Sequence, residues 1–193
     1  MNDAELVEQI LNGNNNAFRF LVGKHQRLVL HVVGRIIQRQ EEVEDISQEV
    51  FIKVFKQLKR FRGESRLSTW IAKIAYNTSV SHLRQKIRRG EQSYDEKPAL
   101  IAFERDSSLN QKMVEKKEAK RYLMLMIESL PVNYRTVLTL YHLEEFSYKE
   151  IEQITGMPEG TIKSYLSRAR KLLKGKLEKV VEKEKTNIFV DYA

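Results

Sequence analysis

The chain contains no cysteine, which excludes disulfide bonds, thiolate catalysis and cysteine-ligated zinc. Only three prolines occur among the 193 residues, at positions 98, 131 and 158, so helices can run long. No apolar run approaches the ~18 residues needed to cross a bilayer. The acidic N-terminus MNDAELVEQI also lacks the apolar core of a signal peptide. These absences predict a cytoplasmic protein that does not insert into a membrane.

Acidic residues are outnumbered, with 26 Asp and Glu against 34 Lys and Arg, a net charge of +8. A basic chain suits a polyanionic partner. Residues 160–185 hold nine Lys and Arg against three Glu, whereas residues 41–49 hold five acidic residues and no basic one. The charge therefore separates a basic region suited to nucleic acid from an acidic segment. A second basic cluster consists of Arg84, Lys86, Arg88 and Arg89.

Helical periodicity covers most of the chain, with no internal repeat and no pair of adjacent strands. Residues 90–112 break the pattern with Gly, Pro, Ser, Asn and mixed charge, which indicates a linker. The sequence predicts an all-α protein of two small helical domains joined by this flexible linker. We expect helices at residues 3–11, 17–39, 42–58, 68–88, 113–130 and 132–143, followed by two helices within 147–173.

Residues 147–173 have the pattern of a helix-turn-helix. Ser147 and Glu150 form a capping box, Gly156 suits a left-handed helix end, and Pro158 suits the first turn of a second helix. The apolar residues of the second helix are spaced four, three and four apart, which places them on one stripe. They are Ile162, Leu166, Ala169 and Leu173.

The opposite face of the second helix offers small residues, hydroxyls and cations. A recognition helix needs this combination to approach the major groove and to contact phosphates and base edges. The alternative is a solvated basic surface helix, but the caps and the clean division of faces agree with one another and favour DNA binding. The predicted contacts are Gly160, Thr161, Lys163, Ser164, Ser167, Arg168 and Lys171.

With these segments in view, the chain resembles an extracytoplasmic-function (ECF) sigma factor of the sigma-70 family. The resemblance rests on VEDISQEVFIKVFKQLKRFRGESRLSTWIAKIAYNTSVSHLR at 43–84 and on SLPVNYRTVLTLYHLEEFSYKEIEQITGMPEGTIKSYLSRARKLL at 129–173. It covers nearly the whole length, with two motif blocks in the family's order. No inhibitory N-terminal region or middle domain is expected in a chain of 193 residues.

The resemblance implies a transcription initiation factor rather than an enzyme, with no catalytic residue, metal or cofactor. Its implied partners are core RNA polymerase, promoter DNA in duplex and melted form, and an anti-sigma factor, although no residue identifies the last. The implied organisation is a region 2-like domain at 1–89, the linker at 90–112, a region 4-like helix-turn-helix domain at 113–185, and a tail at 186–193 that we leave uninterpreted.

Particular residues inherit roles from the resemblance. The helix-turn-helix residues above would read the upstream (−35) element, with Lys163 standing where arginine is common, which weakens bidentate reading of guanine. The acidic block would dock on the clamp helices of the polymerase's largest subunit through Asp45, Gln48 and Glu49. On the residues alone, a solvated acidic face is the favoured interpretation of this block, and the resemblance reverses that preference.

The FRGES loop and the helix after it would hold the unstacked strand of the downstream (−10) element. Phe61 would stack on a base and Asn77 would bond a base edge. The alternatives are a core role for Phe61 and Trp70, and simple solvation for Asn77 and the basic cluster. The predicted contacts are Phe61, Arg62, Gly63, Ser65, Asn77, Arg84 and Arg88.

Two other classes of protein compete with this interpretation. A stand-alone regulator with a receiver domain would need alternating strands and helices in residues 1–90, which show only helices. A carboxylate-bridged metal enzyme would need Glu three residues before a His, and none of the four histidines has one.

The length of the linker agrees with the resemblance. The 23-residue linker can reach at most ~75 Å, and two DNA elements two helical turns apart lie roughly 70 Å from each other.

Overall fold

The computed structural model describes residues 2–37, 39–90 and 123–190, with side chains as far as residue 178. Throughout this part of the chain the regular elements are helical, which confirms the all-α prediction. The predicted linker from residue 91, the helix start at 113–122 and the tail end at 191–193 lie outside the described residues. The elements are α1 (Asp3–Leu11), α2 (Asn15–Gly34), α3 (Gln40–Gln57), a 3₁₀ helix (Leu58–Arg60), α4 (Leu67–Arg88), a helical segment at 123–128, α6 (Val132–His142), α7 (Tyr148–Thr155) and α8 (Glu159–Val190).

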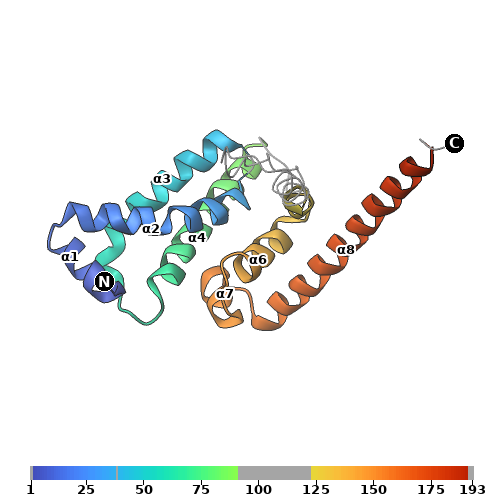
Figure 1. Cartoon of the computed structure of the whole chain (residues 1–193). Helices are drawn as coiled ribbons and strands as arrows, with labels where there is room; N and C mark the ends of the chain where they lie inside the picture. Colours follow the sequence, from blue (N-terminus) through green and yellow to red (C-terminus); the bar gives the residue numbers. More distant parts are fainter. Residues whose placement is uncertain (1, 38, 91–122, 191–193) are drawn as a thin grey trace, which may run out of the picture.

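The first four helices enclose one apolar core. In Figure 1, α2 and α3 lie beside α4, and α1 covers one end of the group. Leu21, Val50 and Ile71 come from three different helices and are each 0 % exposed. Burying a side chain of this size stabilises the fold by about 1.5–3 kcal/mol, so the packing of apolar stripes holds this half together.

The predicted helix at 17–39 is wrong at its C-terminal end, because α2 stops at Gly34. Arg35 caps the helix, Ile36 lies in the following turn and Ile37 comes directly after it, and both isoleucines remain buried. The spacing of apolar residues indicates burial and not backbone conformation. Two buried residues beyond the helix therefore extended the apolar pattern and made the predicted helix too long. At the other end, the Asn14 side chain accepts the backbone N–H groups of Asn16 and Ala17.

The helix-turn-helix prediction is confirmed. Ser147 and Glu150 form the reciprocal capping box at the start of α7. Gly156 ends α7 in the left-handed conformation, with φ 72°. The second helix, α8, begins at Glu159, and its backbone continues through residues 186–190 of the predicted tail.

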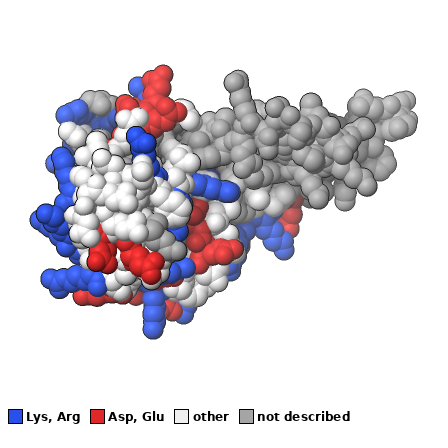
Figure 2. Space-filling model, turned by 60° about the vertical axis from the view of Figure 1, so that its left-hand side comes forward, with Lys and Arg blue, Asp and Glu red and all other residues white. Residues whose placement is uncertain are grey.

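The two halves of the molecule pack against each other. Helix α7 contacts α4 and α6 contacts α2, while most of α8 projects away (Figure 1). Figure 2 shows Lys and Arg along the left edge of the visible face and Asp and Glu in separate clusters. No helix in the described part of the chain has the length and apolar character needed to cross a bilayer.

Candidate nucleic-acid interface

Helix α8 presents a polar outer face opposite its buried stripe. Consecutive helical residues turn by about 100°, so positions four, three and four apart share a face. The four apolar residues predicted to form a stripe are all buried. The residues about 180° away from that stripe are all exposed: Gly160, Ser164, Ser167 and Lys171. The structure thus brings together four of the seven predicted upstream contacts.

Lys163 and Arg168 border this outer face on its two sides. The Lys163 ammonium lies 2.6 Å from a Glu159 carboxylate oxygen and 5.3 Å from the centre of the Tyr148 ring. The hydrogen bond to Glu159 raises the pKa of Lys163. On the other side, Arg168 donates a hydrogen bond to Tyr134, which raises the pKa of Arg168. Both cations stay exposed and are already oriented, so less side-chain entropy is lost when they contact an anion.

Thr161 differs from the other predicted contacts because it is half-buried, on the side of α8 that carries Arg168. The helix wheel places Thr161 and Arg168 on the same flank. Thr161 therefore lies at the border of the outer face and not at its centre.

Helix α4 carries a second exposed polar stripe. Four residues are spaced four, three and four apart on one face, and all are exposed: Asn77, Ser81, Arg84 and Arg88. The C-terminal part of this stripe lines an open hollow of about 490 Å³ together with Ile87. Lys73, four residues before Asn77, is exposed on the same side and was missed by sequence reasoning. The i+4 spacing was the signal that would have found Lys73 and Ser81.

The loop before α4 stands at the start of this stripe. Phe61 and Trp70 are both half-buried and meet edge to face, with ring centres 5.6 Å apart. Gly63 takes a left-handed φ of 73°, which other residues rarely adopt. Arg62 and Gly63 are exposed and Ser65 is half-buried. Phe61 thus packs on the rim of the core and keeps part of its ring accessible.

The predicted polymerase contacts on α3 differ in their exposure and in their partners. Asp45 and Gln48 are exposed. Glu49 turns toward α4 and lies 2.7 Å from the Lys53 ammonium and 2.6 Å from a His82 nitrogen. Hydrogen bonds from Lys53 and His82 outweigh burial and lower the pKa of Glu49. The prediction grouped three residues, but only two of them face solvent freely.

Two apolar residues extend the exposed face of α3 and were not predicted. Ile52 is 53 % exposed and Phe55 is 52 % exposed, seven and ten residues after Asp45. Phe55 meets Phe18 of α2 edge to face, with ring centres 5.0 Å apart. The signal in the sequence was two apolar residues that do not fit the buried stripe of Ile46, Val50 and Val54.

The acidic side chains of α3 do not assemble a metal site. Glu42 pairs with Lys86 and Glu49 with Lys53, so these carboxylates face cations. Within residues 2–37, 39–90 and 123–178, no group of three or more His, Cys, Asp or Glu side chains is arranged to hold a metal ion. The arrangement instead offers two exposed polar faces suited to nucleic acid and one mixed acidic and apolar face suited to a protein.

Comparison with known proteins identifies both halves. The family described as "Sigma-70 region 2" matches residues 21–89, and "Sigma-70, region 4" matches residues 120–173. RNA polymerase sigma-H factor of Pseudomonas aeruginosa is 34 % identical over 176 residues, which cover 89 % of this chain and 91 % of the relative. The ECF RNA polymerase sigma-E factor of Escherichia coli K12 is 32 % identical over 188 residues, which cover 95 % and 98 %.

Solved structures share the fold. RpoE of Bartonella quintana, in complex with the anti-sigma factor NepR, has a TM-score of 0.66 at 23 % identity and covers 83 % of this chain and 96 % of its own. CnrH, in complex with the cytosolic domain of CnrY, has a TM-score of 0.63 at 20 % identity, with coverage of 91 % and 97 %. The resemblance seen in the sequence is confirmed. The chain belongs to the ECF sigma factors of the sigma-70 family, which initiate transcription by binding core RNA polymerase and promoter DNA.

Proposed function

We propose that this sigma factor reads the −35 element with the outer face of α8 and recognises and melts the −10 element with the loop before α4 and the stripe along α4. In this proposal residues 1–89 form the polymerase-binding and melting domain, and residues 113–185 form the −35 domain. The observation that carries it is the pair of exposed polar faces, each on a helix whose opposite side is anchored in an apolar core.

The outer face of α8 fits the major groove of duplex DNA. Gly160 has no Cβ and lies open, with no atom within 4 Å of where a Cβ would stand, so the helix start can approach the bases closely. Ser164 and Ser167 offer hydroxyls to base edges or phosphates. Arg168, held by Tyr134 at the flank, can present its planar guanidinium to a guanine.

Two variants of α8 test the reading of the −35 element. Arg168→Ala should lose about 1–3 kcal/mol of discrimination at one base pair, because a base-reading arginine is removed. Lys171→Ala should weaken binding to all sequences alike and flatten the salt dependence by about one unit, because it contacts phosphate. Fluorescence anisotropy on matched and scrambled duplexes measures both. Equal losses on the two duplexes for Arg168→Ala would refute its role in base reading.

The α4 stripe fits a single strand of DNA. An amide at Asn77 can both donate to and accept from a base edge. Arg84 and Arg88 follow two and three turns later on the same face, where their charges can track a phosphate backbone. Phe61, packed against Trp70 at the start of the stripe, would offer its aromatic ring as a surface on which a base can stack.

The exposed face of α3 supplies the polymerase contact in this proposal. Asp45 and Gln48 provide charge and hydrogen-bonding groups, and the exposed apolar side chains of Ile52 and Phe55 provide surface to bury. Interfaces commonly place such apolar anchors within a polar rim. Glu49, paired with His82 and Lys53, would shape this face and bind less directly.

An anti-sigma factor is the remaining partner that we propose. The support is that two proteins of the same fold, CnrH and RpoE of Bartonella quintana, were solved in complex with the cytosolic domain of CnrY and the anti-sigma factor NepR respectively. Co-expression with the products of neighbouring genes, followed by co-purification, would identify it.

Transcription in vitro tests the proposal as a whole. Core polymerase with this chain should initiate at defined sites on genomic fragments, and start-site mapping should reveal two shared elements upstream. Initiation at the same sites by core polymerase alone would refute the assignment.

A further inference from the structure

Two exposed cations of α8 are joined by a row of aromatic rings. The Lys163 ammonium lies 5.3 Å from the centre of the Tyr148 ring. The Tyr148 ring stacks on the ring of Tyr141, with centres 5.0 Å apart and planes 11° apart. The Arg170 guanidinium lies 5.8 Å from the centre of the Tyr141 ring. We call these four side chains, in this order, the aromatic row.

Three helices supply the aromatic row. Lys163 and Arg170 are seven residues apart on α8, so they lie on the same side of that helix. Tyr148 is the first residue of α7, and Tyr141 lies near the end of α6. The row therefore depends on how the three helices of the C-terminal half pack together.

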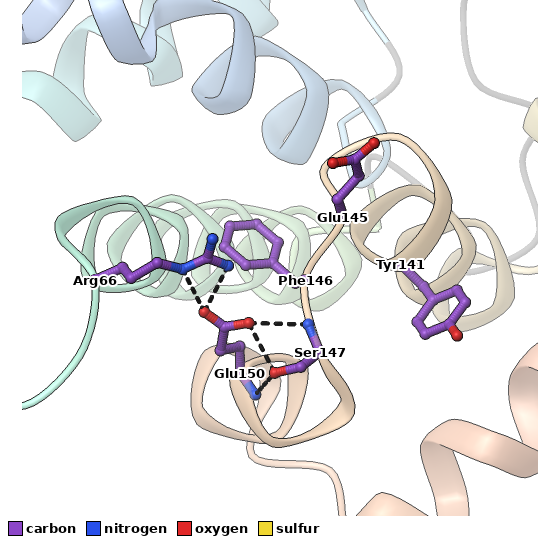
Figure 3. Close-up of a pocket in the computed structure, with 6 residues that line it drawn as sticks. All are labelled: Arg66, Tyr141, Glu145, Phe146, Ser147 and Glu150. Atoms are coloured by element: carbon purple, nitrogen blue, oxygen red, sulfur yellow. Dashed lines mark hydrogen bonds and ion pairs between the residues drawn. The ribbon is translucent and has the colours of Figure 1, made fainter.

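The aromatic row is distinct from the nearby ion pair between Arg66 and Glu150. Figure 3 shows the ring of Tyr141 pointing away from these two side chains, although all three line the same open hollow of about 670 Å³. Tyr141 thus serves the row on the α8 side of the hollow, while Arg66 and Glu150 pair with each other.

Polar contacts hold both ends of the aromatic row. A Glu159 carboxylate oxygen lies 2.6 Å from the Lys163 ammonium. At the other end, Arg170 Nη2 lies 3.1 Å from His142 Nε2. Burial and the Arg170 charge lower the pKa of His142, so a neutral His142 can accept this hydrogen bond. A hydrogen bond between the two phenol groups of the row raises the pKa of Tyr148. Rotation of either cation therefore breaks a contact at its end of the row.

Lys163 is the member of the row that is placed to meet a base. It is the fifth residue of α8, in the N-terminal half that a recognition helix places in the major groove. A lysine carries a point charge on a flexible stem, so it discriminates between bases poorly unless its direction is fixed. The ring of Tyr148 and the carboxylate of Glu159 both attract the ammonium and restrict the directions open to it.

We propose that Tyr148 is a positioning residue for reading of the −35 element: its ring, stacked on Tyr141, directs the Lys163 ammonium at one base pair. Arg170 supports the stack from the far end of the row. The proposal rests on the function proposed above, in which α8 reads the −35 element. Tyr148 acts through Lys163 and needs no contact of its own with DNA.

A packing role is the competing explanation for Tyr148. Its side chain is half-buried and packs against the apolar core. Two replacements separate packing from positioning. Tyr148→Phe keeps the ring, whereas Tyr148→Leu keeps an apolar side chain and removes the ring. A packing role predicts the same base preference for both folded variants, and a positioning role predicts that only Tyr148→Phe preserves it.

Selection of promoter DNA by the reconstituted holoenzyme measures the base preference. Core polymerase with the full chain binds a promoter whose −35 element is randomised, and the bound DNA is sequenced. The position at which Lys163→Ala loses its preference is the base pair that Lys163 reads. At that position Tyr148→Leu should lower the preference by about two- to fivefold, which corresponds to an exposed cation–π contact, and Tyr148→Phe should retain it. If Lys163→Ala loses preference at no position, the proposal is wrong.

A double-mutant cycle shows whether Tyr148 acts through Lys163. In the Lys163→Ala background, Tyr148→Leu should cause no further loss of preference, because the side chain that it positions is absent. A further loss of the same size would overturn the proposal. Weaker binding of all sequences alike by Tyr148→Phe would also overturn it, because the phenol hydroxyl would then contact a phosphate.

Nuclear magnetic resonance of the full chain with isotope-labelled lysine tests the contact itself. The Hε protons of Lys163, assigned by their absence in Lys163→Ala, should be shifted upfield by the Tyr148 ring. Tyr148→Leu should remove this shift and Tyr148→Phe should keep it. The matched control is Tyr165→Leu, which removes a half-buried tyrosine that pairs with Tyr134 on the other flank of α8. This control should leave the Lys163 signal unchanged, and an unchanged signal in Tyr148→Leu would refute the contact.

The selection experiment separates this proposal from the proposed function. If the unmutated holoenzyme shows no preference at any −35 position, the proposed function is wrong and the positioning role falls with it. If the unmutated holoenzyme shows a preference that Tyr148→Leu fully retains, the positioning role alone is refuted.

Discussion

Replacement of two glycines of the helix-turn-helix by alanine should change its stability in opposite directions. Gly156 adopts φ 72° at the end of α7, and its N–H donates to the backbone oxygen of Glu152 at 2.8 Å. No atom lies within 4 Å of where a Cβ would stand at either Gly156 or Gly160. Steric crowding by neighbours is therefore excluded at both positions, and only the backbone conformation of each glycine decides the effect on folding.

The expected magnitudes follow from that difference. A left-handed conformation costs a non-glycine residue about 1–2 kcal/mol, so Gly156→Ala should destabilise α7 and α8 by roughly 1 kcal/mol after the reduced entropy of the unfolded chain is counted. Gly160 lies in the first turn of α8, where alanine should stabilise the helix by about 0.5 kcal/mol. On the outer face, however, the added methyl group should hinder approach to DNA.

Hydrogen exchange and DNA binding measure the two effects separately. Exchange of peptides covering residues 148–173 should be faster for Gly156→Ala and slower for Gly160→Ala. Affinity for the −35 duplex, measured where both variants are fully folded, should fall for Gly160→Ala and stay unchanged for Gly156→Ala. Unchanged exchange in Gly156→Ala would refute the left-handed cap, and unchanged affinity in Gly160→Ala would refute close approach of α8 at that position.

Three further predictions concern other parts of the molecule. Asn77→Ala should reduce opening of a duplex promoter and relax base preference at one −10 position, as measured by permanganate footprinting. If the variant is equally active and equally selective on a duplex promoter and on a pre-melted one, Asn77 contacts no base. Ile52→Asp should weaken binding to core polymerase without unfolding the chain, whereas Leu177→Asp, at a similarly exposed apolar residue of α8, should not; equal affinities would remove the α3 face from the interface. Burial alone would raise the pKa of Glu150, but hydrogen bonds from neighbouring groups hold that pKa below its ordinary value of 4.5. The stability that Glu150 contributes is therefore present above pH 4.5 and is lost as the pH falls through the folded pKa. Acid titrations followed by circular dichroism should therefore be shallower below pH 4.5 for Glu150→Gln, and superimposable curves would contradict this.

Local sequence signals predicted the helix-turn-helix well. A capping box and a C-terminal glycine act through neighbours three or four residues apart, so Ser147, Glu150 and Gly156 determine the ends of α7 almost alone. The outer face of α8 follows from the same short-range periodicity. At α2 the same reasoning failed, because Ile36 and Ile37 are buried by tertiary packing beyond the end of the helix.

Local sequence signals could not predict the contacts between the two halves of the chain. Arg35 and Glu128 are 93 residues apart, and Arg66 and Glu150 are 84 apart. Isolated charged residues in a sequence carry no mark of their partners, and a charged residue is usually solvated. The sequence accordingly predicted two domains joined by a linker. Nothing in it indicated that Arg66, the arginine after the FRGES loop, would pair with the first helix of the helix-turn-helix.

Glu150 connects the folding of the helix-turn-helix to the contact between the halves. One carboxylate oxygen accepts from the Ser147 backbone N–H at 2.9 Å and hydroxyl at 2.7 Å, while the other accepts from Arg66 and Thr69. Loss of the contact between α4 and α7 would break only the second set, because the two sets use different oxygens. The capping bonds, typically worth about 1 kcal/mol, remain and keep α7 folded. Substitution of Arg66 should therefore remove the contact with α4 and leave the capped start of α7 intact, so the helix-turn-helix should keep its fold.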